Sequence, residues 1–169
     1  MANNPALTLL MVATLKGFPF QWKKGVDNLS ILSIGTGYQN FQKAPKDVTK
    51  NWLLKWASNI PDMLMQDASW QNQIMMQWMS DSPTAEHIDM EMGDLRNDQL
   101  TKNPLFRYLR YNQAFTVNDL NGLKLSKKID GDFLEDLLEM SNSENRFLLY
   151  EIGQRTAIEK IRQNHFEHF

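Results

Sequence analysis

The hydrophobic pattern near the beginning of the chain predicts a helix followed by a strand. Asn4 suits an N-cap, because its side-chain oxygen can accept from a free backbone N–H, and Pro5 suits the first helical position. The almost wholly apolar stretch that follows ends near Gly17, so we expect a helix that is buried on most sides. A short apolar run at about 28–35 then predicts one clear core strand.

Later segments are mostly helical. From residue 48 the pattern predicts one helix to about Ser58 and a second that begins at Pro61 and ends before Pro83. Alternating apolar and polar residues mark two candidate short strands, near 87–92 and 105–112.

Two capping boxes indicate helices toward the C-terminus. Asp132 with Glu135 would begin a helix that runs to about Met140, and Ser141 with Glu144 would begin a longer one. A core strand that follows a buried helix after a short turn favours a parallel sheet with helices on both faces. We therefore expect an α/β fold, either as one domain or as a piece of a larger domain whose core is shared.

Composition narrows the classes of function. The chain has no cysteine, which excludes disulfides, thiolate metal sites and a cysteine nucleophile. Its longest apolar run is far shorter than the roughly 20 residues of a membrane span. The net charge of -2 conceals seven Lys and two Asp in residues 1–60 against one Arg and eight acids in 61–100. This pattern is not typical of a nucleic-acid-binding protein.

Two motifs at short spacing carry a family resemblance. The segment "ANNPAL", which leads into the buried helix, and the strand ending "LSIGTG" resemble the second half of a patatin-like phospholipase domain. "YLRYNQAF" and "KIDGDFLEDLLEM" are similar to later family segments, so the resemblance covers most of the chain. It implies an α/β fold with a mixed or parallel sheet and flanking helices, of which residues 1–169 would be the C-terminal portion.

The resemblance implies a serine hydrolase that acts on phospholipids or other acyl esters through a Ser-Asp dyad and needs no cofactor. The carboxylate would serve as base for the serine, and backbone N–H groups would stabilise the oxyanion. No glycine of this chain begins a G-x-S-x-G motif, and the family's D-G-G or D-G-A motif would precede Asn3. We therefore expect the nucleophile serine and the dyad aspartate upstream of Met1, no catalytic residue in this chain, and no activity of the chain alone.

Five residues are candidates for the border of the family's pocket. They are Asn3, Asn4, Gly35, Thr36 and Gly37. Asn3 and Asn4 could help to hold the loop of the family's catalytic aspartate, or they could serve helix capping alone, which the sequence favours for Asn4. A strand exit explains the Gly-Thr-Gly turn, because the dinucleotide pattern would need a glycine at Asn40. Turn and N-cap chemistry likewise explain the Asp-Gly pair at Asp130, so no catalytic role is transferred to it.

No metal site is expected. On a strand, His87, Asp89 and Glu91 would share a face, but alternate residues are roughly 6 to 7 Å apart, which favours a solvated edge. His165 and His168 fit an exposed chain end. Seven of the ten methionines lie at 63–92, where they suit either core packing or a wall that adapts to acyl chains.

Two other readings remain open. The chain can be a genuine short, non-catalytic protein that binds lipid, a partner chain bearing the nucleophile half, or a second copy of itself, with exposed apolar surface on its opening helix and strand. It can also be an unrelated α-rich binding module whose motif match is accidental. Patatin-like proteins occur both in the cytoplasm and as exported effectors, so the resemblance leaves localisation open.

Overall fold

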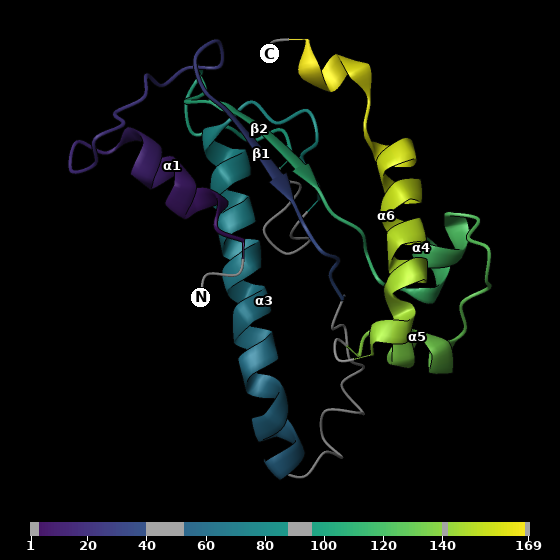
Figure 1. The fold of residues 1–169 in the computed structure, drawn as a ribbon. Helices are drawn as coiled ribbons and strands as arrows, with labels where there is room; N and C mark the ends of the chain where they lie inside the picture. Colours follow the sequence, from purple (N-terminus) through teal and green to yellow (C-terminus); the bar gives the residue numbers. More distant parts are fainter. Residues whose placement is uncertain (1–3, 40–52, 88–95, 140–141, 168–169) are drawn as a thin grey trace. The chain divides into compact units, whose positions relative to one another are not determined.

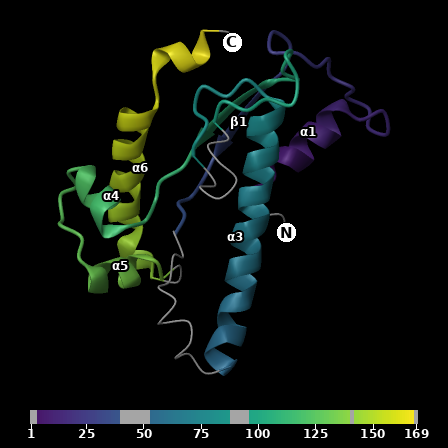
Figure 2. The same ribbon diagram turned by 180° about the vertical axis from the view of Figure 1, so that it is seen from behind.

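The structure is a computed structural model that describes residues 4–39, 53–87, 96–139 and 142–167. Within these ranges it contains α-helices, two short 3-10 helices and a two-stranded parallel sheet (Figures 1 and 2). The expected mixture of helix and strand is therefore present. In chain order the elements are α1 Ala6–Thr14, β1 Ser30–Ile34, α3 Leu53–Met79, β2 Arg107–Tyr111, α4 Val117–Gly122, α5 Gly131–Leu137, η1 Ser143–Asn145, α6 Arg146–Lys160 and η2 Gln163–Phe166.

The described chain divides into two compact units. The first unit comprises residues 4–33, 53–87, 96–110 and 164–167. The second comprises 34–39, 111–139 and 142–163. Each unit has its own cluster of buried hydrophobic side chains.

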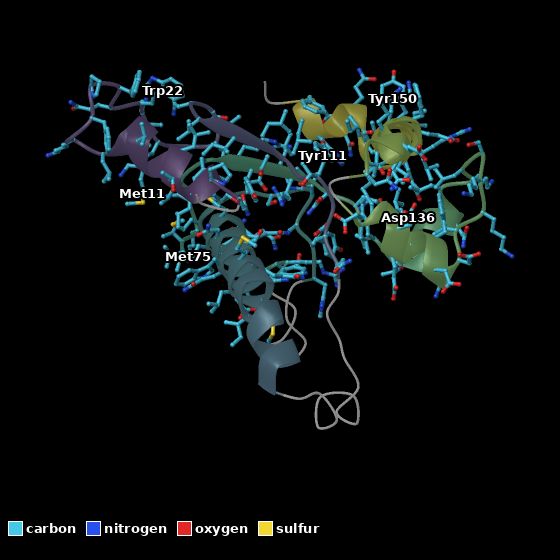
Figure 3. The ribbon with its side chains drawn as sticks, turned by 60° about the horizontal axis from the view of Figure 1, so that its bottom comes forward. Met11, Trp22, Met75, Tyr111, Asp136 and Tyr150 are labelled. Carbon is cyan, nitrogen blue, oxygen red and sulfur yellow. The ribbon has the colours of Figure 1, made fainter. Side chains whose placement is uncertain are left out.

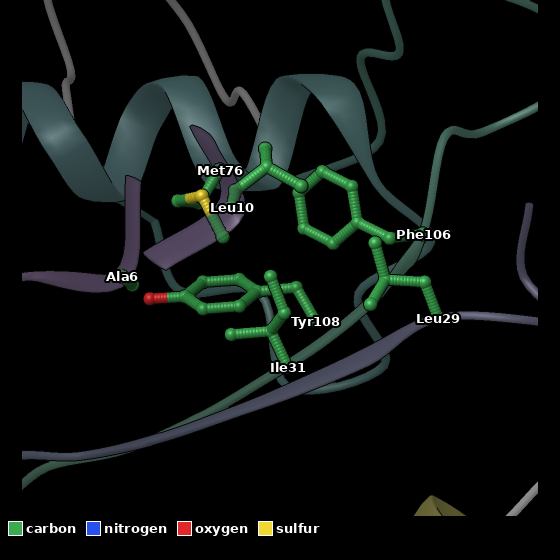
Figure 4. Close-up of a cluster of buried hydrophobic side chains, with 7 residues drawn as sticks. All are labelled: Ala6, Leu10, Leu29, Ile31, Met76, Phe106 and Tyr108. Atoms are coloured by element: carbon green, nitrogen blue, oxygen red, sulfur yellow. The ribbon is translucent and has the colours of Figure 1, made fainter. Parts of the chain in front are cut away.

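The first unit packs two helices on one face of the strands. Figure 4 shows Tyr108 of β2 lying between the strands and the helices, with Met76 of α3 above it. Residues of α1, β1, α3 and the β2 region fill this core: Ala6, Leu10, Leu29, Ile31, Met76, Phe106 and Tyr108. The predicted core strand is confirmed as β1, and the candidate strand near 105–112 is confirmed as β2.

Helix α1 is buried on one side only, so the expectation of burial on most sides is wrong for the described residues. Ala6, Leu10 and Ala13 are buried, whereas Leu9 and Met11 are 51% and 48% exposed. The physical reason is that residues spaced three or four apart share one helical face, and this is the face that meets the core.

Helix α3 is one helix from Leu53 to Met79, so the prediction of two helices separated near Pro61 is wrong. A proline inside a helix removes one hydrogen bond and clashes with the preceding turn, at a cost of about 3 kcal/mol or more. The other peptide groups of the segment still pair within the helix. The penalty at Pro61 therefore did not end the helix.

Strand β2 is paired on both edges, and all five of its residues are buried. On one edge the Arg107 N–H donates to the Leu29 carbonyl at 2.9 Å, beside β1. On the other edge Asp81 forms a parallel bridge with Arg107, and the Tyr108 N–H donates to the Asp81 carbonyl at 2.9 Å. The segment after α3 thus protects the edge that β1 leaves open. The other candidate strand, near 87–92, lies outside the described residues except for His87, which is not in a strand.

The second unit packs α4, α5 and α6 around its own core. Its buried residues are Phe115, Leu120, Leu123, Ile129, Leu137 and Ile152. Sequence reasoning missed α4, although Thr116 caps it by accepting from the Asp119 N–H at 3.1 Å. The spacing Thr-x-x-Asp is a local signal that could have located this short helix.

Helices α5 and α6 were predicted in the right places. Asp130 is the N-cap of α5, and its carboxylate accepts from the Phe133 N–H at 2.9 Å. The predicted N-cap chemistry at Asp130 is therefore confirmed, whereas the prediction that Asp132 begins the helix is wrong. Asn142 caps the turn before α6 by accepting from the Glu144 N–H, while Ser141 lies outside the described residues. Asp130 is preferred because its extended backbone lets its side chain face the helix N-terminus. Across the described ranges, every helix is too short or too polar to span a bilayer.

Candidate functional site

The clearest candidate site is a buried polar cluster in the first unit. It is formed by Asn4 before α1, Ser33 of β1, and Tyr108 and Arg110 of β2. Three of these side chains, those of Asn4, Tyr108 and Arg110, are buried. Of the residues predicted at the pocket border, Asn4 therefore belongs to this cluster.

The catalytic dyad that the family resemblance implies is not among the described residues. The nucleophile serine and the dyad aspartate are expected upstream of Met1, and both Met1 and the predicted border residue Asn3 lie outside the described ranges. The position of the dyad relative to Met1 thus stays a prediction.

Asn4 connects the start of α1 to α3. It has a left-handed backbone with φ of 60°, a conformation that asparagine tolerates better than most residues. Its Nδ2 donates to the Ser69 carbonyl at 3.3 Å, and its own carbonyl accepts from Asn72 Nδ2 at 3.1 Å. The prediction that Asn4 caps α1 is wrong: Pro5 occupies the cap position, and no side chain caps it. The Asn4 side chain cannot cap the helix because it faces α3 instead.

Tyr108 lies at the centre of the cluster. Burial raises the pKa of its phenol, and the nearby Arg110 charge and the Ser33 and Asn4 side chains only partly oppose that rise. Although these polar groups are close, neither the Tyr108 hydroxyl nor Asn4 Oδ1 has a hydrogen bond of good geometry within the described structure. The pKa direction means that Tyr108 remains a neutral phenol at physiological pH.

Arg110 brings a buried positive charge to the cluster. Its Nη1 donates to Ser33 Oγ at 2.7 Å, and its backbone N–H donates to Thr84 Oγ1 at 2.8 Å. Its Nε has no partner, and in the described ranges no carboxylate lies within ion-pair distance of its guanidinium. Because a buried charge is costly unless it is paired, Arg110 Nε and the Tyr108 hydroxyl are donors that could bind an anionic or carbonyl oxygen.

Arg107, the first residue of β2, has a different environment from that of Arg110. Its Nη1 donates to Asp81 Oδ2 at 3.0 Å. The Arg107 side chain is 7% exposed and that of Asp81 is 43% exposed. This ion pair reinforces the backbone bridge between the same two residues, so we assign Arg107 to the fold rather than to the candidate site.

A buried amide network fixes the segment after α3 beside the cluster. Gln77 Nε2 donates to the Glu86 carbonyl at 3.0 Å, and the Glu86 N–H donates to Gln77 Oε1 at 3.2 Å. Gln73 Nε2 donates to both Gln77 Oε1 and Glu86 Oε2. Sequence reasoning missed this network. The signal was available, because Gln73 and Gln77 lie four apart and flank the core residue Met76.

The Gly-Thr-Gly turn belongs to the second unit and follows β1 directly. Asn112 Oδ1 accepts from the Gly37 N–H at 2.8 Å, and the Gly35 N–H donates to the Tyr111 carbonyl at 2.8 Å. The turn is therefore packed against the residues after β2. Thr36, between the two glycines, is exposed.

A cleft of about 400 Å³ also lies in the second unit, away from all the predicted pocket residues in sequence. Glu151 accepts there from the Ser126 hydroxyl at 2.5 Å and from the Ser126 N–H at 2.8 Å. These hydrogen bonds lower the pKa of the Glu151 carboxyl. A lowered pKa makes a carboxylate a weaker base, so this serine and carboxylate form a clamp between a loop and α6 rather than a catalytic dyad.

The residues considered for a metal site or an acyl-facing wall lie in several environments. Within the described residues, no group of three or more His, Asp or Glu side chains could hold a metal ion. His87 is exposed, and Asp89, Glu91 and His168 lie outside the described residues. Of the methionines, Met76 is buried in the core and Met79 packs against it, whereas Met63, Met65 and Met75 are exposed. Among the described methionines of α3, those that contribute to the core, Met76 and Met79, therefore lie near the C-terminal end of the helix.

Comparisons with known proteins gave no relative. No family model matches the chain, and searches of curated proteins and of solved structures each found no match.

Proposed function

We propose that this chain is part of a patatin-like acyl hydrolase domain that acts on phospholipids or other acyl esters. The resemblance of "ANNPAL" and "LSIGTG" to that family supports the proposal. So does the arrangement of α1 and β1, which follow each other in the chain, are joined by residues 15–29 and share one core. Two parallel strands with helices on one face are compatible with a piece of an α/β domain.

The observation that carries the proposal is the set of unpartnered polar atoms beside Asn4. Asn4 Oδ1, the Tyr108 hydroxyl and Arg110 Nε are all buried and lack a hydrogen bond of good geometry within the described structure, although Ser33 and Asn4 lie near enough to the Tyr108 hydroxyl to lower its pKa. Each such atom costs about 1–3 kcal/mol when it is left without a partner. A fold that keeps three of them together favours a ligand or another segment that satisfies them.

The family resemblance suggests which segment that would be. In patatin-like domains the loop with the catalytic aspartate comes just ahead of the Asn-Asn-Pro segment, which in this chain means upstream of Met1. A loop at that place would bring carbonyl oxygens, N–H groups and a carboxylate toward Asn4. Arg110 and Tyr108 would then hold this loop in position, while the serine would come from a G-x-S-x-G motif, which residues 1–169 do not contain.

Labelling with a fluorophosphonate tests the proposal. An antibody to this chain would capture the native polypeptide from its source cells, and the captured protein would be treated with a fluorescent fluorophosphonate. We expect a polypeptide longer than 169 residues to label and to release fatty acid from phospholipid vesicles, and the purified 169-residue chain to do neither. Turnover by the purified chain, or a longer native polypeptide that neither labels nor hydrolyses lipid, would contradict the proposal.

A second candidate function is partner binding without catalysis, and exposed apolar side chains of α1 favour it. Leu9 and Met11 are about half exposed and lie on different sides of the helix, because residues two apart do not share a helical face. A partner could cover this exposed apolar area. Analytical ultracentrifugation of the purified chain would separate the two ideas. A stable monomer that does not bind an apolar dye would argue against a partner-binding face.

A further inference from the structure

The segment after α1 forms an exposed loop that is rich in aromatic and basic residues. We call residues 15–24 the aromatic–basic loop; all of its side chains are exposed. The aromatic rings of Phe20 and Trp22 are 56% and 54% exposed, and they meet edge to face with centroids 6.1 Å apart. Figure 3 shows Trp22 and Met11 on opposite sides of α1, so the loop is distinct from the face that carries Met11.

The backbone of the loop is held in place although its side chains are exposed. The Trp22 N–H donates to the Ala13 carbonyl at 2.7 Å, and the Phe18 N–H donates to the Leu15 carbonyl at 3.1 Å. These bonds tie the loop to the C-terminal end of α1. The aromatic rings are therefore presented by a defined turn, which lowers the entropy lost when they bind.

The charge around the rings has one sign. Lys16, Lys23 and Lys24 are exposed and flank the aromatic residues. The first acidic residue of the chain is Asp27, beyond the loop. The loop thus combines exposed aromatic rings with three cations and no carboxylate.

We propose that the aromatic–basic loop docks on the surface of an anionic lipid bilayer. Aromatic side chains favour the boundary between lipid headgroups and acyl chains, and lysines bind the negative surface while their stems cover apolar area. A second copy of the loop is a poor occupant, because the lysines of the two copies would repel each other. This proposal does not depend on the hydrolase proposal, since the loop would bind lipid whether or not the complete protein cleaves it.

Cosedimentation of the purified chain with lipid vesicles tests the charge contribution. We expect binding to vesicles of phosphatidylcholine with phosphatidylserine, weaker binding to phosphatidylcholine alone, and loss of binding as salt is raised. Each surface lysine contributes about fivefold in affinity, so Lys23→Gln with Lys24→Gln is expected to weaken binding roughly 25-fold. Lys102→Gln with Lys128→Gln removes the same charge from exposed sites outside the loop and should change binding by less than about twofold.

The aromatic contribution is tested at constant charge. Phe20→Ser with Trp22→Ser is expected to weaken binding about tenfold or more, because the rings lose their burial in lipid. Phe147→Ser with Ile158→Ser is the matched control, since these residues are 72% and 71% exposed outside the loop. Circular dichroism would verify that each variant folds. If the aromatic double variant does not fold, the lysine double variant still tests the proposal.

Three outcomes would overturn the proposal. Equal binding to neutral and anionic vesicles would remove the charge argument. Control variants that weaken binding as much as the loop variants would show that the loop is not the docking site. Loop variants that abolish self-association of the chain without changing vesicle binding would assign the loop to a protein interface instead.

Discussion

The side-chain oxygen of Asn112 accepts a hydrogen bond from the backbone N–H of Gly37 at 2.8 Å, and this contact fixes the turn that follows β1. The same oxygen accepts from the Gln113 N–H at 3.1 Å. Around it the backbone passes so close that a Cβ on Gly35 would lie 2.3 Å from Asn112 Oδ1. Packing thus gives the glycines of this turn a structural role that requires no phosphate or other ligand.

Replacement of either glycine of the turn should destabilise the protein. Gly37 has φ of 108°, and a Cβ there would lie 2.3 Å from the Phe115 ring, so Gly37→Ala combines backbone strain with a clash. We expect the free energy of unfolding to fall by about 2–4 kcal/mol, measured by urea denaturation. Gly131→Ala is the control, because a Cβ at Gly131 meets nothing within 4 Å. Equal stability of the Gly37 variant and the wild type would refute this account of the turn.

The Asn121 side chain closes the loop between α4 and α5, and its removal should be costly. Its Nδ2 donates to the Ile129 carbonyl at 2.8 Å, and its Oδ1 accepts from the Ile129 N–H at 2.9 Å. Ile129 is buried, so Asn121→Ala leaves two backbone groups without partners. We expect a loss of about 2–4 kcal/mol in the free energy of unfolding. Asn118→Ala, at an exposed position of the same helix, should cost less than about 0.5 kcal/mol; similar losses for both variants would show that the clamp adds nothing.

The elements that sequence reasoning found are those whose signals are local. The apolar run at 28–35 needed only its own pattern to predict β1, and the spacing of Asp132 and Glu135 sufficed to predict a helix in the region of α5. Pro61 misled because its penalty is local, whereas the continuity of α3 depends on the pairing of the whole helix. Asn4 misled in the same way, since its side chain faces α3 at Ser69, far along the chain at a separation of 65 positions.

The candidate site itself depends on pairing that no short motif specifies. Arg110 meets Ser33 only because β1 and β2 pair in parallel, and the two residues are 77 positions apart. In the sequence, Asn4 and "YLRYN", which begins at Tyr108, are separate parts of a family resemblance. No sequence pattern showed that Asn4 and Tyr108 would be buried side by side. The charge of the aromatic–basic loop was visible in the sequence as an excess of lysine, whereas the exposure of Phe20 and Trp22 was not.

The clamp between Ser126 and Glu151 should make the free energy of unfolding depend on pH in the acidic range. Two hydrogen bonds from Ser126 lower the pKa of Glu151, so the clamp contributes above the ordinary glutamate pKa and is lost as pH falls through the lowered value. Ser126→Ala should raise the Glu151 pKa toward its ordinary value, as measured by NMR titration of the side-chain carboxyl carbon. Ser143→Ala, at a nearby exposed position, should leave it unchanged. An unchanged Glu151 pKa in the Ser126→Ala variant would show that Ser126 does not stabilise the Glu151 carboxylate.

Tyr108 should make the free energy of unfolding fall as pH rises in the alkaline range, whereas the Glu151 contribution is lost as pH falls. Because burial raises its pKa, the folded protein keeps the phenol protonated at a pH where the unfolded chain ionises it. Its contribution is present below the ordinary tyrosine pKa of about 10 and is lost as pH rises through the higher folded value. Tyr108→Phe removes this dependence, so urea denaturation at increasing pH should show a smaller loss of stability for the variant than for the wild type.

The same variant tests whether the buried cluster serves stability or function. Since the Tyr108 hydroxyl has no hydrogen bond of good geometry within the described structure, its removal should leave the free energy of unfolding at neutral pH unchanged or raise it by about 1 kcal/mol. Arg107→Met, which breaks the ion pair with Asp81, should instead lower it. If Tyr108→Phe destabilised the chain by as much as Arg107→Met, the hydroxyl would be part of the fold, and the proposal that it holds a catalytic loop would lose its main support.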